Sequence, residues 1–330
     1  MKKVFLILAL ASLCYSCWRN NYGYEYPNAT ISTTPVNFDI INSEYDDYNA
    51  SLPTIGGIFP LCFSTNRNSA GQDFDVIYKL IRFEFSKETG LFDIEEQLND
   101  EQGYLDVYKD INDATDRINT SYDEYGPYLV TGASDRSLDK ILLYGNNESG
   151  DFDIKLTHNY NSNDYDTIVS IPFLNSSFDD YYPAFNEDSS QVFFCSNRNG
   201  SFSIFNVDLD PSISLLDRLY DDSPKTVSPI DILNSAQDDK CPFIAGDFMV
   251  FTSNRAGGFG GFDLYYSELI NGKWSEPTNF GSEINTEYDE YRPIVNFFDN
   301  RFTNDLMIFS SNRPGGLGGF DLYYVGVDAG

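Results

Sequence analysis

The sequence lacks most features from which enzyme sites and membrane spans are built. It has one histidine, no paired-histidine metal motif, no Gly-x-Ser-x-Gly elbow and no phosphate-binding glycine loop followed by a helix. After the first residues, no apolar run is long enough to span a bilayer. Lysine and arginine number 21 against 51 aspartates and glutamates, and this formal charge of −30 disfavours nucleic acid and anionic lipid surfaces as partners.

Cysteines are also few, and their spacing predicts neither a disulfide framework nor a metal site. Cys62, Cys195 and Cys241 lie in apolar, strand-like runs, so we expect buried free thiols. His158 lies in the polar stretch "KLTHNYNSNDYD", and we expect a solvated loop residue there rather than a general base.

The chain begins with an export signal. Residues 1–17, "MKKVFLILALASLCYSC", combine lysines, a short apolar run and a small residue before Cys17. The end of this segment resembles the lipobox of bacterial lipoproteins, which implies lipid attachment at Cys17; an ordinary secretory signal is the alternative. We expect residues 18–33 to form a tether. No acidic cluster follows Cys17, which favours the periplasmic face of the outer membrane over the cell surface.

A repeated unit dominates the remaining sequence. The run "SSNRPGGLGGFDLYY" at 310–324 repeats "TSNRAGGFGGFDLYY" at 252–266. Three more divergent copies begin near residues 41, 118 and 175, and successive copies are 77, 56, 59 and 51 residues apart. These intervals are close to those of propeller blades, and the longest holds an insertion at about 86–116.

Each copy reads as short strands rich in Val, Ile, Phe and Tyr, broken by Gly, Asn, Asp and Pro. Asn271-Gly272 predicts a hairpin into a fourth strand around Trp274. We therefore predict an all-β, five-bladed β-propeller of four-stranded antiparallel blades, in one domain over residues 34–330. The last copy stops after its third strand, so we predict that Pro35 to Asp39 pairs with Phe320 to Tyr324 and closes the ring.

The pattern Pro-x-Phe, Phe-x-Ser-Asn-Arg and Phe-Asp-Leu-Tyr resembles the WD-repeat-like propeller repeats of TolB-like proteins and of many envelope proteins of Bacteroidetes. The resemblance covers nearly all of the chain after the signal. It implies an envelope lipoprotein that acts as a protein-binding scaffold without catalysis. Its partners would be envelope proteins or a peptidoglycan-associated assembly. TolB-like propellers have six blades, whereas five copies are present here.

Two adjacent acids open the first strand of every copy. The pairs are Asp46 and Asp47, Asp123 and Glu124, Asp179 and Asp180, Asp238 and Asp239, and Asp289 and Glu290. If these strands are innermost, the pairs approach one mouth of the channel as an acidic ring, which could bind calcium or another hard cation, or basic groups of a partner. No other cofactor is expected. The alternative is that each first Asp caps its own turn.

Aromatic residues flank these acids, and we expect either a stacking surface for sugars or peptides, or packing between blades. They are Tyr45, Tyr48, Tyr122, Tyr125, Phe178, Tyr181, Tyr288 and Tyr291. A second recurrent set predicts charge-assisted pairs across one hairpin: Arg67 with Asp75, Arg255 with Asp263, and Arg313 with Asp321. Copy two has Asn147 where this alignment expects Arg, and copy three has Ser203 where it expects Asp.

A rival function is a carbohydrate-binding or glycoside-hydrolysing five-bladed propeller that uses carboxylates in the central channel. The acids recur blade by blade, whereas a catalytic pair needs two carboxyl groups in unlike surroundings. We therefore favour the scaffold, and a deep asymmetric pocket would favour the rival.

Overall fold

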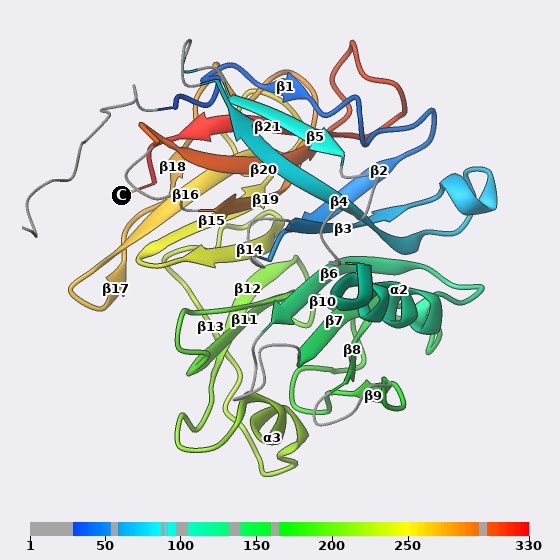
Figure 1. The fold of residues 1–330 in the computed structure, drawn as a ribbon. Coiled ribbons are helices and arrows are strands. Elements are labelled where there is room, and N and C mark those ends of the chain that lie inside the picture. Colours follow the sequence, from blue (N-terminus) through cyan, green and yellow to red (C-terminus); the bar gives the residue numbers. More distant parts are fainter. Residues whose placement is uncertain are drawn as a thin grey trace, which may run out of the picture.

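Five antiparallel sheets follow one another around a ring in the computed structural model (Figure 1). The structure describes residues 29–53, 59–86, 90, 92–96, 105–131, 139–159, 165–296 and 302–329. The predicted all-β, five-bladed propeller is confirmed. The predicted signal and lipidation residue Cys17 lie outside the described residues.

Each blade starts with its innermost strand and proceeds outward. Blade one contains β2 (Asp47–Ser51), β3 (Phe59–Thr65), β4 (Asp75–Phe85) and β5 (Phe92–Glu96). Blade two contains β6 (Glu124–Thr131), β7 (Lys140–Asn146), β8 (Asp153–His158) and β9 (Val169–Ser170). Blade three contains β10 (Asp180–Phe185), β11 (Gln191–Ser196), β12 (Ser203–Asp208) and β13 (Ser228–Pro229). Blade four contains β14 (Asp239–Ala245), β15 (Phe248–Ser253), β16 (Asp263–Ile270), β17 (Lys273–Trp274) and β18 (Thr278–Asn279).

Blade five joins the two ends of the described chain. It contains β19 (Glu290–Asn296), β20 (Asp305–Ser311), β21 (Asp321–Val327) and, as its outer strand, β1 (Val36–Asn37). Val36 pairs with Tyr324 and Asn37 with Tyr323, which confirms the predicted closure. The contacts continue upstream, where Ala29 and Ile31 are fully buried. These two residues belong to the propeller rather than to the tether predicted over residues 18–33.

The insertion predicted at about 86–116 serves two blades. It supplies β5 and most of the helix α2 (Leu105–Ile118), whose Ile111 and Ala114 pack with Cys62 of blade one and Leu142 of blade two. In blade four, the predicted Asn271-Gly272 hairpin is present and leads to β17. The outer-strand position that corresponds to β1 is taken by β18, which pairs with Tyr265 and Tyr266 of β16.

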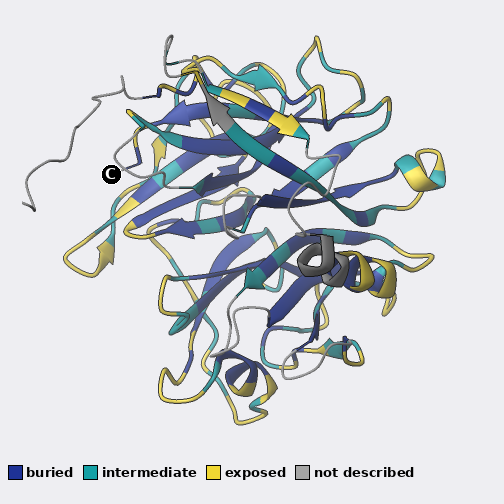
Figure 2. Ribbon diagram, in the orientation of Figure 1, coloured by how far each residue is buried: buried dark blue, intermediate teal, exposed yellow. Residues whose placement is uncertain are grey.

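The middle strands explain the apolar runs of the sequence. Every residue of β3, β7, β15 and the interior of β20 is buried, because each blade is covered by a neighbour on both faces (Figure 2). Cys62, Cys195 and Cys241 are buried free thiols, as predicted. None of the described helices has the length and apolar composition needed to cross a membrane.

Candidate functional site

The second acid of each pair lies inside its own blade. Asp47, Glu124, Asp180, Asp239 and Glu290 have no exposed surface. In four blades the arginine of the Ser-Asn-Arg run reaches this carboxylate: Arg67 binds Asp47, Arg198 binds Asp180 at 2.6 Å, Arg255 binds Asp239 at 2.5 Å and Arg313 binds Glu290 at 2.9 Å. Each of these four acids is therefore one half of a buried, structural ion pair, and its carboxylate is not accessible to a binding partner.

The predicted pairs of Arg67 with Asp75, Arg255 with Asp263 and Arg313 with Asp321 are wrong. The arginines bind the fully buried acids of the first strands instead, although Asp263 and Asp321 are also buried, because those two acids already have backbone partners. Asp263 and Asp321 instead accept backbone N–H groups of their own glycine loops, from Phe259 and Gly260 and from Leu317 and Gly318. Asp75 accepts a hydrogen bond from Asn68 at 2.9 Å.

The first acid of each pair joins neighbouring blades. Asp46, Asp123, Asp179, Asp238 and Asp289 accept backbone N–H groups from Phe320, Phe74, Phe152, Phe202 and Phe262 of the preceding blade, at 2.8 to 3.1 Å. Each carboxylate thus lies at a blade junction instead of capping its own turn alone. Among the described residues, no group of three or more His, Cys, Asp or Glu side chains is placed to hold a metal ion. Cation binding by the acidic ring stays a prediction.

Blade two departs from this pattern at Glu124. Glu148, rather than Asn147, occupies the arginine position, because Asn147 binds Asp123 as the equivalent Asn does in other blades. The Lys155 ammonium bonds Glu148 at 2.9 Å. Glu124 receives only neutral donors, and burial raises its pKa from 4.5 to about 7.

Tyrosines close the channel near the acid pairs. The first strand of every blade carries a register shift, and Asn49, Gly126, Tyr182, Cys241 and Arg292 have positive φ there. Contacts across the ring show that the channel is filled: Tyr48 of blade one stacks on Tyr291 of blade five at 5.2 Å, and Tyr182 of blade three lies 6.3 Å from Tyr291. A Cβ atom at Gly126 would overlap the Tyr182 ring, so the glycine makes room for it.

Seven of the eight aromatic residues beside the acids divide into two groups, and the eighth, Tyr45, is half-buried and lies against the Gly71 turn of its own blade. Tyr48, Tyr125, Tyr181 and Tyr291 pack against one another and against neighbouring blades. Tyr122, Phe178 and Tyr288 are 43%, 46% and 37% exposed. Packing explains the inner group, while the outer group lies at the surface.

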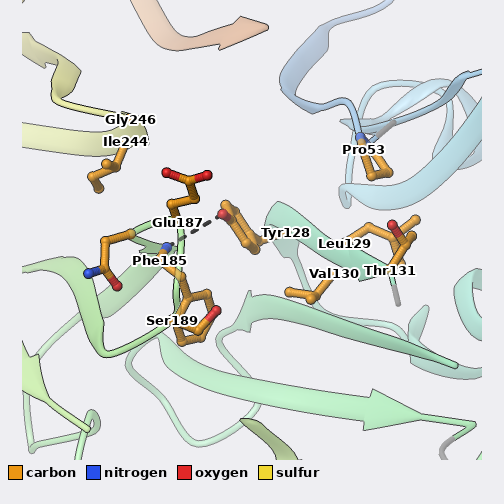
Figure 3. A pocket seen from close by; sticks show the side chains of 11 residues that line it. Pro53, Tyr128, Leu129, Val130, Thr131, Phe185, Glu187, Ser189, Ile244 and Gly246 are labelled. Atoms are coloured by element: carbon orange, nitrogen blue, oxygen red, sulfur yellow. Dashed lines mark hydrogen bonds between the residues drawn. The ribbon is translucent and has the colours of Figure 1, made fainter. Parts of the chain in front are cut away.

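A cleft of about 530 Å³ is present at the opposite ends of the first strands. It is lined by Pro53, Tyr128, Leu129, Val130, Thr131, Phe185, Asn186, Glu187, Ser189, Ile244 and Gly246, from blades one to four (Figure 3). The Phe185 N–H donates to the Tyr128 hydroxyl at 3.4 Å. Within this described lining, Glu187 is the one carboxylate. Sequence reasoning missed this cleft because it followed the acids at the starts of the strands.

A short helix fixes the turn that carries Glu187. Helix α3 (Leu215–Tyr220) is capped by Ser214, and its Arg218 is buried. The Arg218 guanidinium donates to the carbonyl oxygens of Ser189 at 2.7 Å and Ile213 at 2.8 Å. Because one side chain bonds both segments, the Glu187 turn is held against the helix.

His158 is not the solvated loop residue that we expected. It ends β8, is 5% exposed, and its Nε2 lies 3.1 Å from the Tyr220 hydroxyl. Burial lowers the pKa of its imidazole. His158 is absent from the described lining of the cleft.

No family model and no curated protein matches this chain. Among solved structures, an exo-β-1,3-galactanase from Phanerochaete chrysosporium is 12% identical with a TM-score of 0.50, over 89% of this chain and 64% of that one. An α-L-arabinofuranosidase from Podospora anserina is 11% identical with a TM-score of 0.49, over 91% and 96%. A putative TolB from Agrobacterium tumefaciens is 15% identical with a TM-score of 0.38, over 73% and 66%.

These comparisons contradict our prediction of a TolB-like scaffold without catalysis. The galactanase, with a TM-score of 0.50 over 89% of this chain, shows that the same fold occurs in an enzyme. The TolB resemblance is thereby reduced to the propeller fold. At 12% identity the galactanase likewise shows the fold alone, so the function has to be argued from the residues of the cleft.

Proposed function

We propose that this propeller is carbohydrate-active and that it binds a neutral glycan in the cleft lined by Tyr128 and Glu187. The observation that carries the proposal is the composition of the cleft, in which the half-buried ring of Tyr128 shares one lining with the polar side chains of Asn186 and Thr131. The buried Phe185 ring supports Tyr128 from behind, with 5.7 Å between the ring centres. A sugar ring presents apolar C–H faces and a rim of hydroxyl groups, and these two kinds of side chain complement them. The volume of about 530 Å³ suits a short oligosaccharide.

Charge decides which glycans fit best. The chain carries a formal charge of −30, and the only charged side chain in the described lining is the carboxylate of Glu187. Uronic acids and sulfated sugars would be repelled by both the local and the overall field. Neutral hexose and pentose chains therefore suit the cleft better than acidic ones.

We assign Glu187, the one carboxylate of the described lining, to the general base: it takes a proton from a water molecule whose oxygen bonds the anomeric carbon as the glycosidic bond breaks. Solvent supplies the proton that the departing glycosidic oxygen needs. Glycoside hydrolysis ordinarily uses two carboxyl groups that flank the scissile bond, one of them as general acid. The ten repeated acids are unsuited to this role because they hold blades and blade junctions together. Glu187 instead lies in the cleft, on a turn that Arg218 holds in place.

The test is a binding and cleavage assay on the purified chain with β-1,3-galactotriose, an arabino-oligosaccharide, cellotriose and an acidic control oligosaccharide. We expect at least one neutral sugar to bind and Tyr128→Leu to weaken binding at least tenfold. Tyr288→Ala, which removes an exposed tyrosine at the opposite end of the first strands, should leave binding unchanged. Glu187→Gln should abolish sugar release and keep binding. A chain that binds none of these sugars would refute the proposal.

We also propose that the chain acts in the cell envelope, tethered by lipid at Cys17 on the periplasmic face of the outer membrane. The lipobox-like end of residues 1–17 supports this. Fractionation of cells that express the full chain or Cys17→Ala tests it, since only the anchored form should sediment with membranes. Envelope protein partners stay a prediction.

A further inference from the structure

One arginine inside the channel has no counter-charge. Arg292 of β19 lies at the positive-φ position of blade five and has no exposed surface. Among the described residues, its Nε and Nη1 atoms have no hydrogen-bond partner, and Nη2 reaches the Pro127 carbonyl of blade two at a long 3.4 Å. No ion pair joins it to a described carboxylate, whereas Arg313, just after β20 of the same blade, is paired with Glu290.

The side chain extends across the channel. Its guanidinium lies 5.1 Å from the centre of the Tyr182 ring in blade three, so it contacts two blades that do not adjoin its own. It also acts on Tyr128, whose phenol pKa is raised by burial and lowered by the arginine. Arg292 thus lies below the floor of the glycan cleft.

A second unpartnered group occupies the corresponding position of the adjoining blade. Asn49 of blade one is fully buried at the same bulge, and both Nδ2 and Oδ1 lack partners among the described residues. Its backbone N–H bonds the Ser310 hydroxyl at 3.1 Å, which fixes the backbone beside blade five. Arg292 and Asn49 thus bury four polar atoms that have no described partner, at equivalent positions of two adjoining blades, and such atoms in a native structure need an explanation such as a bound ion or water.

Lys240, a second described cation of the channel, differs from Arg292 because a carboxylate lies near its charge. Its ammonium lies 3.9 Å from the centre of the Phe202 ring and 3.9 Å from Asp238. Arg292 has only the ring of Tyr182 and a long carbonyl contact. Leaving a buried guanidinium without an anion is strongly destabilising, and water would satisfy its N–H groups without neutralising it.

We propose that a monovalent inorganic anion of the size of chloride binds in the channel between Arg292 and Asn49. The guanidinium supplies the charge and two unused donors, and the Asn49 amide supplies a third. The Tyr48 and Tyr291 rings stack in the channel on the side of the acid pairs, so we expect a small anion to fit better than a large organic one. The site is separate from the glycan cleft and does not depend on the proposed function.

Crystals of the full chain soaked in bromide give the direct test. We expect an anomalous difference peak within hydrogen-bond distance of Arg292 and Asn49. In solution at constant ionic strength, the Tm should rise as chloride or bromide replaces gluconate, which is too large for the site. A water-sized peak without anomalous signal, together with a Tm that does not distinguish chloride from gluconate, would overturn the proposal.

Substituted variants test whether the dependence of the Tm on chloride comes from Arg292. Arg292→Met keeps an unbranched side chain and removes the charge, so the Tm of this variant should no longer depend on chloride. Asn49→Ala should reduce the dependence, and Lys273→Met, at an exposed lysine of β17, should retain it. If Arg292→Met does not fold, the bromide peak in the unsubstituted chain still decides. A folded Arg292→Met with unchanged chloride dependence would refute the assignment.

Discussion

Glu124 and Glu290 are two buried glutamates in equivalent positions, and comparing them shows how much an arginine counter-charge contributes to stability. Each accepts a hydrogen bond from a threonine hydroxyl four residues earlier, Thr120 at 2.7 Å and Thr286 at 2.6 Å. Both carboxyl groups are fully buried. Burial raises the pKa of both carboxyl groups, but at Glu290 the bound Arg313 guanidinium opposes this rise, whereas Glu124 has no arginine. The same substitution, to glutamine, should therefore have opposite consequences at alkaline pH.

The magnitude follows from the pKa of Glu124, which burial raises from 4.5 to about 7. This rise in pKa corresponds to at most about 3.4 kcal/mol, and relaxation of the folded chain around the ionised carboxyl group reduces it to about 2 kcal/mol. The folded chain keeps the proton at a pH where the unfolded chain has lost it. The contribution of Glu124 is therefore fully present below pH 4.5, and it is lost as the pH rises through about 7.

The assay is chemical unfolding of the unsubstituted chain, Glu124→Gln and Glu290→Gln at pH 5 and pH 8. Relative to the unsubstituted chain, Glu124→Gln should gain about 2 kcal/mol in the free energy of unfolding between pH 5 and pH 8, because it carries no titrating group there. Glu290→Gln should lose about 2 to 4 kcal/mol at pH 8, since it leaves the Arg313 guanidinium unpaired. Equal losses for both variants at pH 8 would refute the reasoning and would mean that Lys155, acting through Asn146, neutralises Glu124.

Two further substitutions test the contacts between blades, and both are read as changes in Tm and in the free energy of unfolding. Gly318→Ala should destabilise the chain by more than Gly315→Ala, because the added methyl group would overlap the backbone of blade one. At Gly315 the methyl group would meet open space, and only the backbone strain of an alanine at a φ of 98° opposes it. Equal losses of stability in the two variants would contradict this. Asp46→Ala should cost about 1 kcal/mol, because it removes the acceptor of the half-buried N–H of Phe320 at a blade junction. Asp39→Ala at an exposed position should cost under about 0.5 kcal/mol.

The repeats were enough to predict the blades and even the partner of the closing strand. Strand order follows when every copy has the same apolar runs and turns, and the missing fourth strand of the last copy had one matching segment, which pairs at Val36 with Tyr324. The contacts of the arginines were mispredicted for a related reason. Arg255 recurs together with both Asp239 and Asp263, so recurrence alone does not tell which acid it binds. Both acids are buried, and Asp263 already accepts the backbone N–H groups of Phe259 and Gly260, which leaves Asp239 for the arginine.

The cleft could not be predicted in the same way, since it is not part of the repeat. Tyr128 and Glu187 lie after the conserved pattern of their copies, where the segments differ in length and composition. A single binding site on a ring of repeated blades has to be formed by residues that the blades do not share. The useful sequence signal would have been the divergence between copies just beyond each first strand.

The same reasoning explains the filling of the channel. A ring of five identical blades would bring five identical side chains to the axis: five tyrosines would overfill it and five arginines would repel one another. The bulge position instead holds Asn49, Gly126, Tyr182, Cys241 and Arg292, and the large ring of Tyr182 fits because Gly126 lacks a side chain. Divergence at this one position permits dense packing, and it also leaves a single cation, Arg292, without a described counter-charge. An anion at that point would complete both the packing and the charge balance of the channel.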